Sequence, residues 1–76
     1  MTKDRLLIIE TECQIPGGRS MRCSAFSRNS RVVLERIRNG KPETVTCARD
    51  VKSVADAKIA IAQWCNISFK SVKEVR

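Results

Sequence analysis

The sequence predicts a single α+β domain over residues 1–76, in which one helix packs on one face of an antiparallel sheet of four or five strands. Two observations support this fold class. Four early segments either alternate apolar and polar residues or flank a strong turn signal, which is typical of half-buried strands. One later segment has a helical period and follows a capping residue. The expected order is ββββα, with or without a fifth strand after the helix.

The first two strands are joined by Pro16-Gly17-Gly18, where proline fixes its own φ and glycine permits positive φ. We expect these strands at Leu6 to Ile15 and at Ser20 to Arg28. If Ile15 pairs with Met21, the register sets Cys13 opposite Cys23 on the apolar face, close enough to touch.

The next hairpin has the strongest local signal in the chain, because Asn39-Gly40 supplies the two positive φ angles that a type I′ turn requires. It lies between the strands expected at Arg31 to Arg38 and Lys41 to Ala48. A two-residue turn pairs Arg38 with Lys41. Counting back from it gives two further pairs that we expect to share the core face: Leu34 with Val45, and Val32 with Cys47.

Ser53 is the expected N-cap of the helix, which should run to about Cys65, with Asp56 near the positive end of the helix dipole. A projection at the helical period places one stripe toward the sheet: Val54, Ala57, Ile61, Trp64 and Cys65. Ala55, Ile59 and Ala62 fall away from that stripe. The β-branched segment from about Phe69 to Val75 predicts a short final strand.

Composition narrows the class of protein. The first apolar run is too short for a secretion signal or a membrane span, so we expect a cytoplasmic protein, in the host cell if a phage encodes it. The four cysteines are therefore expected to be reduced thiols that pack as small apolar side chains. The chain has no histidine, no Cys-x-x-Cys pair and no phosphate-binding loop, so we expect no metal, no cofactor and no catalytic activity.

The net charge of +7, with nine arginines and six lysines, favours an anionic partner. The charge is concentrated in the middle of the chain, and we expect it opposite the face that the helix covers. We call these residues the basic belt: Arg19, Arg22, Arg28, Arg31, Arg36, Arg38 and Lys41. Phe26 lies among them on the outward face of its strand, where it could stack on a base, anchor a protein interface or be covered as part of the core. An ordinary solvated surface is the alternative explanation for the belt.

From Val33 to Trp64 the chain runs strand, Asn39-Gly40-Lys41, strand, Ala48-Arg49-Asp50-Val51, capped helix and tryptophan, which resembles small phage-encoded anti-CRISPR proteins of the type I class. The resemblance implies an inhibitor that binds a CRISPR effector complex and blocks its function. Because the chain is basic, such an inhibitor would not imitate DNA; it would bind an acidic protein surface, guide RNA or DNA, or block a subunit surface by shape. Direct nucleic-acid binding through the same arginines is the alternative, and pairing of exposed sheet edges into a dimer stays open beside both.

Overall fold

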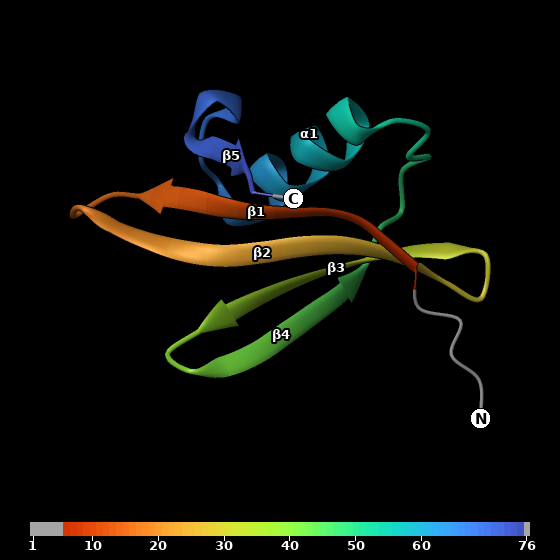
Figure 1. Ribbon diagram of the computed structural model, residues 1–76, viewed down its shortest axis with the longest axis horizontal. Coiled ribbons are helices and arrows are strands. Elements are labelled where there is room, and N and C mark those ends of the chain that lie inside the picture. The colour runs from red at the N-terminus through yellow and green to blue at the C-terminus, as the bar shows by residue number, and fades with distance from the viewer. Residues whose placement is uncertain (1–5, 76) are drawn as a thin grey trace.

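The computed structural model describes residues 6–75 and confirms the predicted α+β fold (Figure 1). Five strands form one antiparallel sheet in the order β4-β3-β2-β1-β5, with one α-helix on one face. In chain order the elements are β1 (Leu6–Ile15), β2 (Arg19–Arg28), β3 (Arg31–Arg38), β4 (Lys41–Thr46), α1 (Val54–Cys65), the 3₁₀ turn η1 (Phe69–Ser71) and β5 (Val72–Glu74).

Two hairpins close with two-residue turns in which both residues have positive φ. Asn39 and Gly40 have φ of 54° and 76°, and Arg38 pairs with Lys41, as the sequence predicts. The connection from β2 to β3 uses Asn29 and Ser30 in the same way, at φ of 52° and 63°. A left-handed conformation suits asparagine and glycine far better than serine, so the second of these turns carries strain that the first does not.

The register of the first hairpin differs from the prediction by two residues. Ile15 pairs with Arg19 instead of Met21, and Cys23 lies opposite Thr11 instead of Cys13. The reason is that Gly17 and Gly18, at φ of 97° and 77°, reverse the chain within the three residues after Ile15. A shift of two keeps every side chain on its predicted face. The two cysteines therefore still meet, diagonally, with their sulfurs 3.4 Å apart.

The helix begins and ends at chemically suitable residues. Ser53 accepts a hydrogen bond from the Asp56 backbone N–H at 3.1 Å, which confirms the predicted N-cap. Asn66 ends the helix in the left-handed conformation, where an asparagine is well tolerated. The helix packs mainly against β1, β2 and β5, and the β3–β4 hairpin extends beyond it (Figure 1).

The core lies between the helix and the sheet, and its helical stripe is wider than predicted. Ala57 and Ile61 are buried there as expected, and Trp64 and Cys65 are partly buried against the core. Val54 is exposed because it is the first helical residue, whereas Ala62 is buried despite its predicted outward position. The helix also contacts η1 and β5, and these two elements add a second packed side to it. The buried cluster comprises Ile9, Cys13, Cys23, Ala25, Leu34, Ala57, Ala60, Ile61, Ala62 and Val72.

The helix-facing side of the β3–β4 hairpin is only partly covered. Leu34 pairs with Val45 as predicted and is buried, and Val32 and Cys47 pack partly against the core. Val45, however, is 39% exposed, so the prediction of a core position for it is wrong. The physical reason is that the helix lies over β1 and β2 and does not reach the edge strand.

The C-terminal segment also differs from its prediction, because the expected strand from Phe69 to Val75 is shorter. A 3₁₀ turn occupies its first three residues, and only Val72–Glu74 form a strand, paired with β1.

A candidate anion-binding groove

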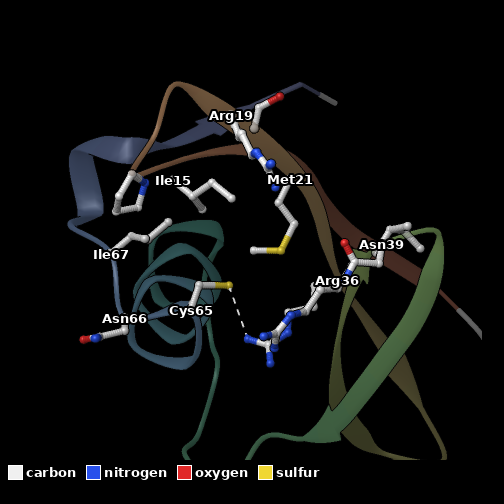
Figure 2. Close-up of a pocket in the computed structure, with 12 residues that line it drawn as sticks. Ile15, Arg19, Met21, Arg36, Asn39, Cys65, Asn66 and Ile67 are labelled. Atoms are coloured by element: carbon white, nitrogen blue, oxygen red, sulfur yellow. Dashed lines mark hydrogen bonds between the residues drawn. The ribbon is translucent and has the colours of Figure 1, made fainter.

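A groove of about 690 Å³ opens where the helix leaves the β3–β4 hairpin uncovered. It lies at the end of the sheet where the β1–β2 turn, the β3–β4 turn and the C-terminal end of α1 come together (Figure 2). The residues that line it are Ile15, Pro16, Arg19, Ser20, Met21, Arg36, Ile37, Arg38, Asn39, Cys65, Asn66 and Ile67.

Three of the basic-belt residues line this groove: Arg19, Arg36 and Arg38. Arg36 pairs with Cys23 across the sheet, which places it on the helix-facing side. Arg19 pairs with Ile15, which lies two residues after the helix-facing Cys13 on β1. Arg19 therefore also faces the helix. The described residues that line the groove include no carboxylate, so its surface is positively charged.

Arg36 is fixed by contacts on three sides. Its Nε donates to Oε1 of Glu43 at 2.8 Å, and its Nη1 donates to the Trp64 carbonyl oxygen at 3.4 Å. The guanidinium also lies 4.2 Å from the centroid of the Trp64 ring, within the range of a cation–π interaction. Its side chain is only 17% exposed. Arg36 therefore links β3, β4 and the end of α1.

Arg38 shares the same carboxylate but is held less firmly. Its Nη1 lies 3.8 Å from Oε1 of Glu43, and its side chain is largely exposed, as is that of Arg19. One carboxylate thus faces two guanidinium groups, and Arg19 adds a third positive charge to the groove. An incoming carboxylate or phosphate would meet planar donors suited to bidentate contacts.

The prediction that the basic belt lies opposite the helix is wrong for four of its seven members. The register places Arg19, Arg36, Arg38 and Lys41 on the helix-facing side of the sheet, and Arg22, Arg28 and Arg31 on the outer side. Side chains alternate between the two faces along each strand. The belt residues of β2 and β3 include both odd-numbered and even-numbered positions, so they cannot all lie on one face. The belt is therefore divided between two faces.

On the outer face, Phe26 is 2% exposed and offers no ring for stacking, so of the alternatives left open for it the buried position is the one observed. It lies on an inner strand of the sheet, in register with Leu7 on one side and Val33 on the other. Arg22 is exposed, with Nη1 3.8 Å from Oε2 of Glu10, so this face carries charges of both signs.

A second, smaller groove of about 380 Å³ lies between β4 and α1. Its lining is mainly apolar: Leu34, Val45, Thr46, Cys47, Ala48, Arg49, Ala60, Gln63 and Trp64. Trp64 belongs to this groove and Arg36 to the first, so their stacked pair lies between the two. A ligand that spans both would meet an apolar surface at one end and arginines at the other.

Three of the four cysteines form a cluster behind the arginine groove. Cys13 and Cys23 are buried free thiols, as expected, and Cys65 Sγ lies 3.8 Å from Cys23 Sγ. Hydrogen bonds with Cys13 and Cys23, and then with Arg36, lower the pKa of Cys65 below its usual value. Hydrogen bonds with Cys13 and Cys65, together with burial, raise the pKa of Cys23. Cys65 comes from the far end of the helix. Apart from its position on the helical stripe, nothing in the neighbouring sequence predicts that it joins the cluster.

Comparisons with protein-family models, with curated proteins and with solved structures found no match. Within residues 6–75, no helix is both long and apolar enough to cross a membrane. In the same part of the chain, no three histidine, cysteine or acidic side chains are placed to hold a metal ion.

Proposed function

We propose that this chain is a small non-enzymatic binding protein that holds an acidic segment of a protein partner in the arginine groove. The observation that supports this most strongly is the convergence of Arg19, Arg36 and Arg38 on one concave surface. Glu43 already binds two of these arginines, which supports a carboxylate as the natural group for this surface.

A polypeptide partner fits the surroundings of the groove better than a nucleic acid does. The apolar groove beside Trp64 and the unpaired edge of β4 both suit an extended peptide, which binds by side-chain contacts and strand addition. Nucleic-acid binding is the second candidate, supported by the exposed residues Arg22, Arg28 and Arg31 on the outer face. That face has less to offer a nucleic acid because Phe26 is buried and Glu10 lies beside Arg22.

The resemblance to type I anti-CRISPR proteins extends this proposal to the kind of partner. The chain would act as an inhibitor in the cytoplasm of a phage-infected cell, where it would bind a CRISPR effector-like complex that handles nucleic acid. The arginine groove would then bind an acidic patch on a protein subunit of that complex. A gel-shift assay in which the chain prevents a type I effector complex from binding its target DNA would test this extension.

The groove itself can be tested with two charge-matched double variants. Arg19→Glu with Arg38→Glu changes two exposed groove residues, and Arg28→Glu with Arg31→Glu changes two exposed residues of the outer face. Each pair alters the net charge equally and spares the structural contacts of Arg36. Fluorescence anisotropy with labelled poly-glutamate, duplex DNA and single-stranded RNA, at two salt concentrations, measures the affinities.

We expect the groove variant to lower the affinity for poly-glutamate by at least about tenfold, which corresponds to about 1.4 kcal/mol. The outer-face variant should change it by less than about threefold at the higher salt concentration, where long-range charge is screened. Equal losses in both variants would contradict the assignment to the groove. Tight DNA or RNA binding with a steep salt dependence, lost only in the outer-face variant, would favour the second candidate.

A further inference from the structure

We propose that Cys65 is a site of oxidation by peroxide, and that oxidised Cys65 forms an intramolecular disulfide with Cys23. The site consists of the Cys13, Cys23 and Cys65 thiols and the Arg36 guanidinium. It differs in chemistry from the anion-binding function, although Arg36 belongs to both.

Access distinguishes Cys65 from its two neighbours. Cys13 and Cys23 are 0% and 1% exposed, whereas Cys65 is only partly buried and lines the arginine groove. Figure 2 shows its sulfur directed toward Arg36, with Nη1 of that residue 4.0 Å away. A small polar oxidant that enters the groove would reach Cys65 first.

The surroundings of Cys65 favour the reactive form of its thiol. Peroxides react with thiolates, and a guanidinium group close to the sulfur stabilises the thiolate. Hydrogen bonds with Cys13 and Cys23 act in the same direction as Arg36, so the pKa of Cys65 is lowered.

Cys23 is placed to complete the reaction. Its sulfur is 3.8 Å from that of Cys65, so the two must approach by a little under about 2 Å to reach the bonding distance of a disulfide. Both residues lie at the interface of α1 and β2, where side-chain rotations can supply such a movement. Cys13, whose sulfur is 3.4 Å from that of Cys23, retains its thiol in the product.

The chemistry balances with one peroxide for each disulfide. The Cys65 thiolate attacks one oxygen of hydrogen peroxide, the O–O bond breaks, and hydroxide leaves and is protonated to water, which gives Cys65 sulfenic acid. The Cys23 sulfur then attacks the sulfenic sulfur, the S–O bond breaks, and the departing hydroxide takes the Cys23 proton as a second water. Two thiols are oxidised by two electrons, and the peroxide is reduced to two waters. The product carries no thiolate beside Arg36.

Peptide mapping can follow each cysteine separately. Trypsin places the four cysteines in four different peptides, because at least one arginine or lysine that is not followed by proline separates each from the next. The reduced full chain is treated with hydrogen peroxide, blocked with iodoacetamide at successive times, digested and analysed by mass spectrometry. Cys47 serves as an internal control, since it is also a partly buried free thiol but lies outside the cluster.

We expect a linked pair of peptides containing Cys23 and Cys65, with Cys65 lost at least about ten times faster than Cys47, as an activated thiolate requires. In Cys23→Ser, Cys65 should accumulate as sulfenic acid that dimedone traps. In Cys65→Ser, rapid disulfide formation should disappear. Loss of Cys65 no faster than that of Cys47, a Cys13–Cys23 disulfide that forms equally fast in Cys65→Ser, or Cys65 disulfides only between chains would each overturn the proposal. The wild-type time course decides the matter even if one variant fails to fold.

Discussion

Replacing Arg36 by methionine tests whether one side chain joins the β3–β4 hairpin to the helix. Methionine keeps much of the apolar stem and removes the guanidinium. The charged hydrogen bond to Glu43 should contribute about 1 kcal/mol, a low value because the Glu43 side chain is 43% exposed. The stacking on Trp64 adds about 0.5–1 kcal/mol. We therefore expect Arg36→Met to lower the free energy of unfolding by about 1.5–2 kcal/mol, from a total of roughly 4–11 kcal/mol for a domain of this size.

Urea unfolding, followed by far-ultraviolet circular dichroism, measures this loss. Arg22→Met is the matched control, because the Arg22 side chain is 66% exposed and its carboxylate partner is 3.8 Å away. That change should cost less than about 0.5 kcal/mol. A double-mutant cycle with Glu43→Gln should give a coupling energy of about 1 kcal/mol. If Arg36→Met costs no more than Arg22→Met, Arg36 does not join the two parts of the fold.

Two further predictions concern the turns and the thiols. Ser30→Gly should raise the free energy of unfolding by about 0.5–1 kcal/mol, because it removes a serine from the left-handed conformation. Gly40→Ala should lower the free energy of unfolding by about 1 kcal/mol, because alanine would have to adopt positive φ although its Cβ has open space there. Changes of the same sign in urea titrations of the two variants would contradict this account. Because the pKa of Cys65 is lowered, its thiolate persists as pH falls. The rate at which Cys65 is alkylated should therefore change little between about pH 8.5 and 6, whereas the rate for an ordinary thiol falls about a hundredfold. Mass spectrometry with glutathione as reference measures both rates, and a hundredfold fall for Cys65 would show that its thiol is not activated.

The features that the sequence predicts well are those encoded by neighbouring residues. Asn39 and Gly40 adopt the positive φ angles that the turn requires, and Ser53 caps the helix through its own side chain. The predicted turn and the predicted N-cap are therefore both confirmed. The register of the first hairpin depends on how tightly Gly17 and Gly18 turn, and composition alone does not determine that.

The candidate site was harder to predict because it depends on contacts between distant segments. The belt arginines were identified from the sequence, but their division between two faces follows from the register and from which strands the helix covers. The thiol cluster needs the end of the helix to meet β1 and β2, which brings Cys65 to a residue 42 positions away in the sequence. Phe26 had a buried and an exposed alternative, and its burial on the outer face depends on neighbouring strands that local alternation does not reveal.

The edge strand β4 contains a proline with a consequence for assembly. Arg38 pairs with Lys41 across a two-residue turn, and the Cys47 N–H donates to the Val32 carbonyl. The N–H and C=O groups of the odd-numbered residues of β4 therefore point toward β3. The residues whose backbone groups point outward are then Pro42, Thr44 and Thr46. Proline has no N–H, so it offers no donor. Only two donors remain on this edge, so an added strand can form only a short ladder at its Thr44–Thr46 end. The same proline limits indefinite edge-to-edge stacking of copies of the chain, while leaving room for one short peptide.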